Sequence, residues 1–320
     1  MINVSIIIPC YNAAPWIREA LRSATGQGLD DTEIIVIDDG SADDSAGIVE
    51  REFPSVRLVR TKNQGPSKAR NLGTKLSSGR FLQYLDADDM LLPGKLKVQS
   101  EALKQSGADV AYGSWQKLIE TAGHVFIKGE EINRSFSNPE IELFTGDSWC
   151  TLGAYLFKRE IVEKIGGWNE RLPYIQDARF ALDCALYGAR FVRCPGLMAY
   201  YRIRRSDSIS TRNPVEHTRD CFRNAFEIEE WWRRHGGINE DRKAALLKAY
   251  GYVSKATFRN DKGTFNLVYG HIKRLGPRYI PDGPLHLKLA SRIFGYLGAE
   301  NFLSWCSRIK SLFKKTLTNS

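Results

Sequence analysis

Residues 80–92 read RFLQYLDADDMLL, and this stretch decides the fold. Its first part, residues 81–85, is apolar, alternates between two faces and has the length of a buried strand. The strand ends in DADD at residues 86–89, which places three carboxylates close together. Such carboxylates repel one another unless a cation neutralises them, and their hard oxygens suit Mg²⁺ or Mn²⁺, usually shared with a phosphate. A solvated turn is the alternative, because Asp is a common turn residue.

Three more apolar segments precede this strand, and each is followed by helical spacing of apolar residues. The predicted strands cover residues 4–9, 33–37 and 56–59, followed by helices that contain Ala20, Ile48 and Leu72, respectively. This alternation is typical of a parallel sheet with right-handed crossovers and helices on both faces. Ligands of such sheets bind at the carboxyl ends of the strands, where Asp38, Asp39, residues 86–89 and the loop with Tyr11 all fall. This shared position favours a binding site over a turn.

A dinucleotide-binding Rossmann domain is the obvious alternative for a parallel sheet, but it requires GxGxxG after the first strand. Here that loop reads PCYNAA at residues 9–14, and the chain contains no Walker A sequence. Phosphates would therefore have to be held by a metal ion and by cationic side chains. Asp86, Asp88 and Arg70 have the chemistry for that task.

The composition indicates a globular protein. The chain has 320 residues, of which 42% are hydrophobic and 26% charged, enough for a sizeable core. No apolar run approaches the ~20 residues of a membrane span, and the apolar residues 2–9 lack the basic leader of a signal peptide. The six cysteines show no CxxC spacing, which argues against a disulfide framework or a zinc site. We therefore expect a cytoplasmic protein.

The sequence predicts two domains with different charge. Residues 1–211 would form the α/β domain, with a nucleotide-binding half at 1–92 and an acceptor half at 93–211, and residues 212–320 would be helical. The net charge is +9, and residues 286–320 hold six basic residues against one acid. We find no nucleic-acid-binding motif within that charge and expect no nucleic-acid partner. Peripheral attachment to an anionic membrane surface is one expectation for the C-terminal helices, and ordinary packing on the first domain is the alternative.

Four motifs in this order and spacing resemble family 2 glycosyltransferases. They read VSIIIPCYN at residues 4–12, VIDDGS at 36–41, NQGPSKARNLG at 63–73 and LDADD at 85–89. The resemblance covers roughly residues 3 to 205. It implies a GT-A fold, a nucleotide-diphosphate sugar donor with a UDP-sugar favoured, Mn²⁺ or Mg²⁺ as cofactor, and inversion at the anomeric carbon.

The resemblance assigns the donor site to the ends of the first strands. Pro9 and Tyr11 would line the nucleoside site. Asp39, with Asp38 beside it, would accept hydrogen bonds from the base or the ribose, although Asp38 could instead hold the loop. Arg70 would contact the base or the diphosphate.

The DADD sequence matches the DxD motif of the family at Asp86, Ala87 and Asp88. Asp88 would coordinate the metal ion that bridges the diphosphate, and Asp86 would hold the ribose or the water shell of the metal. We expect Asp89 to cap the next helix instead.

The general base of the family lies in a Glu-Asp pair that opens a later helix, and the matching pair here is Gln176-Asp177. Asp177 is therefore the predicted catalytic base, without the usual neighbouring carboxylate. A second departure is Arg204, where family members often have His. Arg cannot ligate a metal, but it could neutralise the leaving diphosphate.

The acceptor site would lie in the second half, near Trp149, Gly153 and Trp168. Processive synthases of the family carry membrane spans and a QxxRW motif, and the chain lacks both. We expect transfer of one sugar per encounter to a saccharide or lipid-linked saccharide, in cell-surface polysaccharide or glycan biosynthesis. Two alternatives stay open: a sugar nucleotidyltransferase, which would need a glycine-rich basic loop after the first strand, and a catalytically inactive binding module on the same fold.

Overall fold

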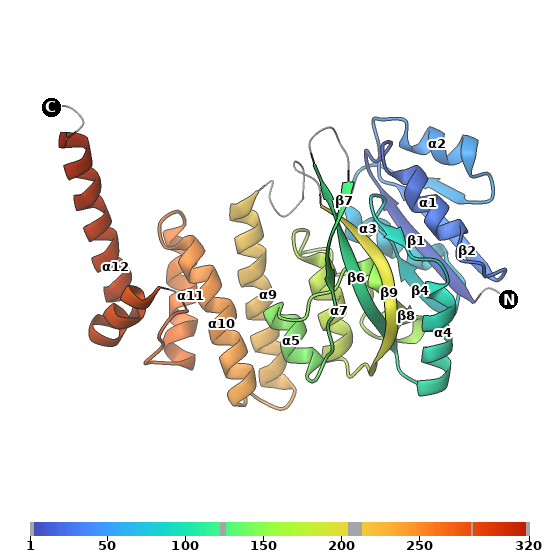
Figure 1. The fold of residues 1–320 in the computed structure, drawn as a ribbon. Coiled ribbons are helices and arrows are strands. Elements are labelled where there is room, and N and C mark those ends of the chain that lie inside the picture. Colours follow the sequence, from blue (N-terminus) through green and yellow to red (C-terminus); the bar gives the residue numbers. More distant parts are fainter. Residues whose placement is uncertain (1–2, 122–125, 204–212, 283, 318–320) are drawn as a thin grey trace. The chain divides into compact units, whose positions relative to one another are not determined.

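The computed structural model describes residues 3–121, 126–203, 213–282 and 284–317. The chain divides into two compact units, Met1–Arg212 and Asn213–Ser320 (Figure 1). The predicted domain boundary after residue 211 falls within 204–212, outside the described residues. Among the described residues, none of the helices combines the length and the apolar composition that a membrane crossing requires.

The first unit is an α/β structure whose strands and helices alternate along the chain. Its elements are β1 (Val4–Cys10), α1 (Ile17–Thr25), β2 (Thr32–Asp38), α2 (Ser45–Glu52), β3 (Arg57–Arg60), α3 (Pro66–Leu76), β4 (Phe81–Tyr84), β5 (Met90–Leu91), α4 (Lys95–Ser106), β6 (Val110–Glu120), β7 (Phe126–Ile132), α5 (Pro139–Thr145), the 3-10 turn η2 (Leu152–Ala154), β8 (Tyr155–Lys158), α6 (Arg159–Lys164), α7 (Gln176–Leu186) and β9 (Phe191–Ile203).

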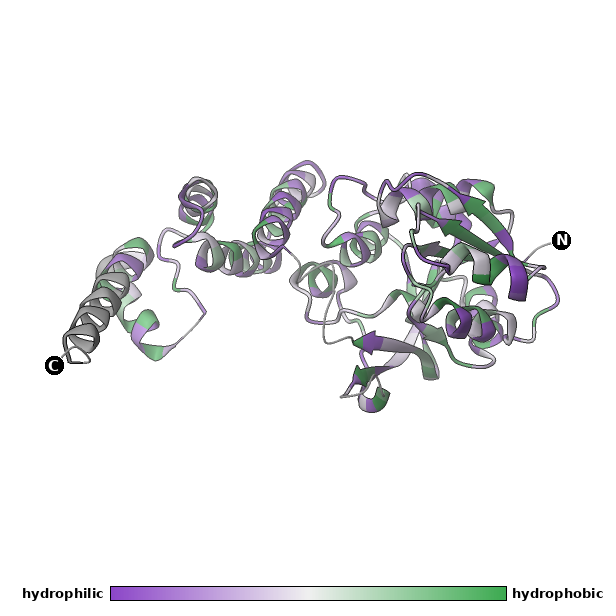
Figure 2. Cartoon of the chain, turned by 90° about the horizontal axis from the view of Figure 1, so that it is seen from above, coloured by the Kyte–Doolittle hydropathy of each residue, from purple (hydrophilic) through white to green (hydrophobic). Residues whose placement is uncertain are grey.

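The nine strands in the described part of the chain belong to one sheet, in the order β3-β2-β1-β4-β8-β6-β9-β5, with β7 paired to β6. The first four strands are parallel, β8 runs antiparallel to both β4 and β6, and β6 is parallel to β9. Every residue of β1 is buried, and Figure 2 shows hydrophobic residues along the strands. The predicted α/β architecture, with a parallel arrangement of the first strands, is confirmed, and the second half of the sheet is mixed.

The register brings the polar strand ends to one edge of the sheet. Cys10 at the end of β1 is paired with Asp38 at the end of β2. The pairing of β1 with β4 ends at Ile7 and Tyr84, and the amide of Leu85 then donates to the Ile7 carbonyl at 3.1 Å. Pro9 therefore lies beyond the β4 ladder, where its missing N–H costs no sheet hydrogen bond.

Helix α3 packs closely on β1 and β2, because Gly73 has no side chain at the crossing. A Cβ built on Gly73 would come 2.4 Å from Cγ2 of Ile7 and 3.4 Å from Cγ1 of Ile37. Both isoleucines are fully buried. This approach fixes the position of the helix that carries Arg70.

The second unit is helical, with α9 (Pro214–Arg234), α10 (Glu240–Thr257), α11 (Lys262–Leu275) and α12 (Leu285–Leu317). Side chains of Asn213, Asn239 and Asp261 cap the first three helices by accepting from backbone amides. Helix α12 is broken at Gly295, whose φ of 69° is left-handed. These caps and this break explain where the helices begin and bend.

A buried carboxylate joins three helices of this unit. Glu229 on α9 accepts hydrogen bonds from Arg233, from Tyr250 on α10 at 2.6 Å and from His271 on α11 at 2.7 Å. Burial opposes ionisation, but the bonds from His271, Tyr250 and Arg233 lower the pKa of Glu229 to about 2. The charged form of Glu229 therefore stabilises the helix packing above its ordinary pKa.

The Gly73→Ala substitution should destabilise the first unit by about 1–3 kcal/mol, because the added methyl group would overpack the α3–β1 contact. This loss would exceed the gain of ~1 kcal/mol that alanine brings to a helix interior. The measurement is the free energy of unfolding in urea. Gly270→Ala on α11 is the matched control, because a Cβ there meets no atom within 4 Å. If both variants were at least as stable as the wild type, the inference that α3 packs too closely on β1 to admit a methyl group at residue 73 would be wrong.

Candidate active site

The candidate site lies at the carboxyl edge of the sheet and is centred on a buried arginine. Arg70 on α3 donates from Nη2 to Oδ1 of Asp86 at 2.5 Å and from Nη1 to Oε1 of Gln176 at 2.7 Å. Its guanidinium lies over the Trp168 ring, 4.4 Å from the ring centre, and its side chain is 3% exposed. Arg70 thus joins the end of β4 to the start of α7.

Gln176 serves as a neutral acceptor at the first position of α7. Its Oε1 accepts from Arg70 and also from the Ser67 hydroxyl at 3.1 Å. Gln176 carries no charge. The positive charge of Arg70 is therefore paired with the Asp86 carboxylate, and it also acts electrostatically on Asp177, the residue after Gln176. Sequence reasoning treated Gln176 only as a missing carboxylate and did not find this link.

The arrangement turns Arg70 inward. The sequence predicts a contact of Arg70 with the base or the diphosphate, and the structure places its guanidinium against Asp86, Gln176 and Trp168. Its effect on a ligand would therefore pass through Asp86, which retains 31% side-chain exposure. Arg70 is best described as a positioning residue.

Asp177 is the second residue of α7 and is half-buried. Burial raises the pKa of its carboxyl group, the amide of Ala178 and the Arg70 guanidinium oppose this, and the nearby Asp86 carboxylate raises it further. These influences also show that Asp177, Asp86 and Arg70 share one electrostatic environment. A carboxylate with a raised pKa holds a proton better, which suits a general base.

Asp89 does not cap a helix, so that prediction is wrong. Helix α4 begins only at Lys95, with Gly94 as its cap residue. Asp89 is buried and accepts from the Arg202 amide at 2.8 Å and from the Thr151 hydroxyl at 3.3 Å. Burial and then the neighbouring carboxylates at 88 and 86 raise the pKa of Asp89 well above its ordinary value. Asp89 anchors β9 beneath the site.

The two acids at the end of β2 are Asp38 and Asp39. The sequence predicts that Asp39 accepts hydrogen bonds from a ligand and that Asp38 could hold the loop, and the structure shows the opposite division. Asp39 holds the following loop, because it accepts from the amides of Gln64 and Gly65 at 2.9 and 2.8 Å and from the Thr61 hydroxyl at 3.1 Å. Within the described residues, Oδ1 of Asp38 is buried and has no hydrogen-bond partner. Asp38 is therefore the acid that lacks a donor.

The loop after β1 presents Tyr11. Asn12 adopts a left-handed φ of 50°, its amide donates to Ser41 Oγ at 2.9 Å, and its side chain accepts from the Ala42 amide at 2.8 Å. These bonds tie the loop to the end of β2 and leave Tyr11 50% exposed beside it. Pro9 itself is buried in β1.

The predicted acceptor residues fall into two groups. Trp168 is buried and stacks on Phe180 at 3.9 Å, and Gly153 is buried where a Cβ would come 2.8 Å from the Cβ of Ala199. Their burial gives both residues packing roles rather than contact with an acceptor. Trp149 remains partly exposed.

Trp149 belongs to an aromatic cluster that sequence reasoning missed. Its ring lies 5.2 Å from Trp115 and 5.5 Å from Tyr201, and these two rings are 5.6 Å apart. Burial raises the pKa of Tyr201, and the charges of Asp89, Asp177, Asp86 and Asp88 raise it further, so the cluster borders the acidic site. The pairing of β6 with β9 creates this neighbourhood, and no local sequence signal reveals it. Arg204 lies outside the described residues.

The acids at the end of β4 can supply only some of the ligands that a divalent cation needs. Among the described residues, no three His, Cys, Asp or Glu side chains are gathered to hold a metal ion. Asp86 and Asp88 offer hard carboxylate oxygens at the partly exposed end of β4. One or two carboxylates completed by phosphate and water oxygens are the usual protein site for Mg²⁺. The residues present therefore fit a divalent cation that arrives with a diphosphate.

The Arg70→Lys substitution should lower the free energy of unfolding by about 1–3 kcal/mol, because one ammonium group cannot bridge Asp86 and Gln176 while stacking on Trp168. Urea unfolding gives this value. Arg60→Lys is the matched control and should be near neutral, since the pair of Arg60 with Glu50 is exposed. Equal stability of the two variants would contradict the bridging role of Arg70.

Comparison with known proteins agrees with this architecture. The chain is 30% identical to the uncharacterized glycosyltransferase EpsJ of Bacillus subtilis over 188 residues, which are 56% of this chain and 53% of EpsJ. It is 34% identical to an uncharacterized glycosyltransferase of Rickettsia bellii over 138 residues, 42% of this chain and 19% of that protein. The matched part of the chain thus spans between about a fifth and about a half of the length of these relatives.

Solved structures share the fold. S. aureus TarS 1–349 in complex with UDP-GlcNAc superposes with a TM-score of 0.58 at 20% identity, covering 92% of this chain and 89% of that one. This likeness confirms the predicted GT-A fold. The sequence model of glycosyl transferase family 2 matches residues 5–166, which is half of the chain. The chain therefore belongs to glycosyl transferase family 2.

Proposed function

We propose that the chain transfers one sugar from a nucleotide-diphosphate sugar to a hydroxyl group of a saccharide or lipid-linked saccharide, with inversion at the anomeric carbon. The observation that carries this proposal is the Arg70 bridge, which links the DxD carboxylate Asp86 to Gln176, the residue that precedes the base candidate Asp177. TarS structures contain UDP-GlcNAc and UDP, and this supports a UDP-sugar as the donor. Biosynthesis of a cell-surface polysaccharide or glycan would be the setting.

The nucleoside would bind between the ends of β1 and β2. The unpartnered Oδ1 of Asp38 would accept from an N–H of the base or a hydroxyl of the ribose, which removes the cost of leaving that buried oxygen without a donor. The exposed ring of Tyr11 would cover the base. Arg204 is proposed to offset the charge of the leaving diphosphate.

The reaction would be a single displacement. Asp177 accepts the proton of the acceptor hydroxyl, the oxygen forms a bond to the anomeric carbon, and the bond to the nucleoside diphosphate breaks on the opposite face. Arg70 keeps Asp86 oriented through the step. A divalent cation held by Asp88 and Asp86 would offset charge on the diphosphate when bound.

The acceptor would approach over the aromatic cluster of Trp115, Trp149 and Tyr201. Within the cluster, Trp115 is buried and supports the other two rings, whereas Trp149 and Tyr201 are partly exposed and present flat apolar faces, which suit the C–H faces of a sugar ring. The Tyr201 hydroxyl lies within electrostatic reach of Asp177. This position would place an acceptor hydroxyl near the base.

Both alternative functions fit the site less well. A sugar nucleotidyltransferase would hold its triphosphate with a glycine-rich basic loop after β1, where this chain has PCYNAA. An inactive binding module would not need a half-buried Asp177 with a raised pKa, whose charge costs stability at neutral pH. A donor-hydrolysis assay distinguishes an enzyme from a binding module.

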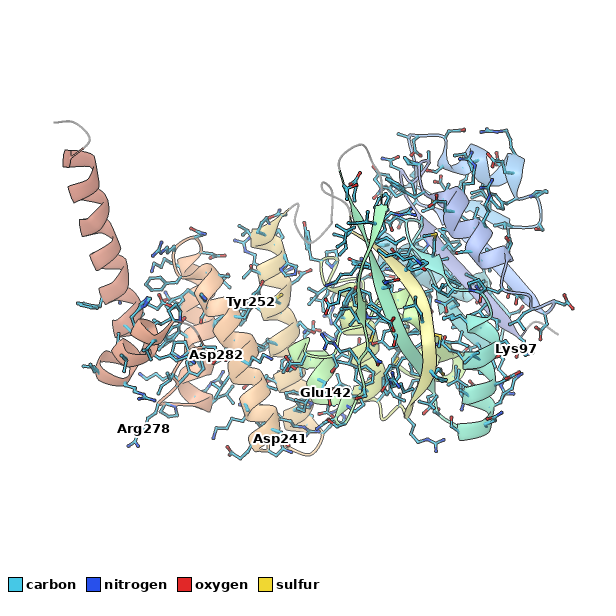
Figure 3. All side chains as sticks on the ribbon, viewed as in Figure 1. Lys97, Glu142, Asp241, Tyr252, Arg278 and Asp282 are labelled. Carbon is cyan, nitrogen blue, oxygen red and sulfur yellow. The ribbon has the colours of Figure 1, made fainter. Side chains whose placement is uncertain are left out.

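The Asp177→Asn variant should lose at least about 100-fold in turnover and bind the nucleotide as tightly as the wild type. The measurements are the rate of donor consumption and the dissociation constant of the nucleotide. Asp241→Asn is the matched control, because Asp241 is exposed and is likewise the second residue of its helix, α10 (Figure 3). Unchanged turnover in Asp177→Asn would overturn the assignment of the base.

Asp177→Asn should also melt at a higher temperature than the wild type. Because the pKa of Asp177 is raised in the folded protein, the unfolded chain loses this proton more readily, and the fold is weakened above that pKa. The rise in melting temperature should be largest near neutral pH and should shrink as the pH falls toward the ordinary pKa of Asp. Melting curves from about pH 4 to about pH 7, in steps of roughly one unit, check this sign.

The Asp88→Asn variant should weaken metal-dependent binding of the nucleotide about tenfold or more, because an amide oxygen is a poorer ligand for a hard cation than a carboxylate. Titrations with Mn²⁺ and with EDTA separate the metal-dependent part. Asp30→Asn is the control, since Asp30 is exposed and precedes the amino-terminal end of β2. If Asp88→Asn kept the full response to Mn²⁺, Asp88 would not be the metal ligand.

A further inference from the structure

The net charge of the chain belongs entirely to its second unit. Residues 1–212 contain 27 Lys and Arg against 27 Asp and Glu, whereas residues 213–320 contain 19 against 10. The catalytic unit is thus balanced, and the helical unit carries the whole formal charge of +9. A charge of one sign concentrated in one unit attracts a partner of the opposite sign.

Helix α12 exposes aliphatic side chains on the face that it does not bury. Before the break at Gly295, the helix buries Leu287 and Ser291. The opposite side presents an aliphatic stripe at four-residue spacing, which consists of Leu285, Leu289 and Ile293 with exposed fractions of 72%, 48% and 74%. Residues four apart lie above one another on a helix. The stripe is therefore continuous and faces away from the core of its unit.

Basic residues accompany this stripe. Lys288 and Arg292 directly precede Leu289 and Ile293 in the helix, and Arg292 is exposed. Glu300 is the single acid among residues 286–320 of the sequence. Its carboxylate interacts with Tyr296, with Lys255 on α10, with Lys262 on α11 and with Arg259 between these two helices. The acid of this segment is thus matched inside the unit. Beside the stripe, Arg292 is exposed, and Lys288 is half-buried with its ammonium 3.7 Å from the exposed carboxylate of Asp282, a surface pair that contributes little to stability.

We propose that the first part of α12 binds the surface of an anionic lipid bilayer, with the aliphatic stripe at the acyl boundary and Lys288 and Arg292 at the lipid phosphates. An apolar helix face flanked by basic residues is the pattern of helices that lie in the plane of the interface. A second copy of the chain fits less well, because the same positive unit would approach itself. The proposal concerns location and does not depend on the donor or acceptor.

The test is co-sedimentation of the full chain with vesicles of phosphatidylcholine alone or with about one-third phosphatidylglycerol. The wild type should bind the anionic vesicles, bind the neutral ones at least about tenfold more weakly, and be released by salt. Leu289→Glu and Ile293→Glu should each weaken binding to anionic vesicles about tenfold or more. Val98→Glu is the matched control, because Val98 is an exposed apolar residue on α4 of the neutral unit.

Lys288→Gln with Arg292→Gln is a second, milder variant that should reduce anionic binding severalfold while the melting temperature stays unchanged. Three results would overturn the proposal. The first is no binding of the wild type to anionic vesicles. The second is that Leu289→Glu and Ile293→Glu bind anionic vesicles as tightly as the wild type, because the vesicle binding would then depend on charge alone and not on the aliphatic stripe. The third is a wild-type dimer in sedimentation equilibrium that Ile293→Glu dissociates, which would make the stripe a contact between two copies.

Discussion

One buried cation organises the candidate site. Arg70 is almost entirely removed from solvent, and a buried charge is tolerated only when it is paired and hydrogen-bonded. Its partners come from two segments that are far apart in sequence, Asp86 after β4 and Gln176 at the start of α7. The close packing of α3 on β1, which Gly73 permits, sets where the guanidinium lies. The position of the Asp86 carboxylate relative to α7, which carries the candidate base, therefore depends on the core of the sheet.

The same edge of the sheet carries charges that do not favour the fold. Asp89 and Asp177 both have pKa values raised by burial, and the crowded carboxylates at 86 and 88 add to the shift of Asp89. Asp38 keeps a buried oxygen without a donor among the described residues. Groups of this kind are commonly found at functional sites, because the ligand supplies the missing partner. These features fit a ligand that brings hydrogen-bond donors and binds together with a cation.

Much of the fold follows from the sequence, because it depends on local patterns. The apolar segments at 4–9 and 33–37 correspond to β1 and β2, and the strand–helix alternation gave the parallel half of the sheet. The motifs also gave the family and the GT-A fold. Asp89 was mistaken for a helix cap, because its partners, the Arg202 amide and Thr151, are more than 60 residues away.

The arrangement of the site itself depends on contacts that span the chain. Asp38 and Asp39 are adjacent and chemically identical, and only the path of the loop at 61–65 decides which of them is satisfied. The bond of Ser67 and Arg70 to Gln176 joins positions more than 100 residues apart. The cluster of Trp115, Trp149 and Tyr201 forms only when β6 and β9 pair. Residue types thus predict which chemistry is present, whereas the packing decides which side chain performs it.

The most direct test of the central claim is calorimetric titration of the full chain with UDP, GDP and dTDP, each in Mn²⁺ and in EDTA. The site described here predicts that one nucleotide binds in Mn²⁺, with UDP favoured, and that EDTA weakens the binding at least about tenfold. Absence of binding by all three nucleotides to a folded sample would contradict a nucleotide-diphosphate sugar site at the carboxyl edge of this sheet.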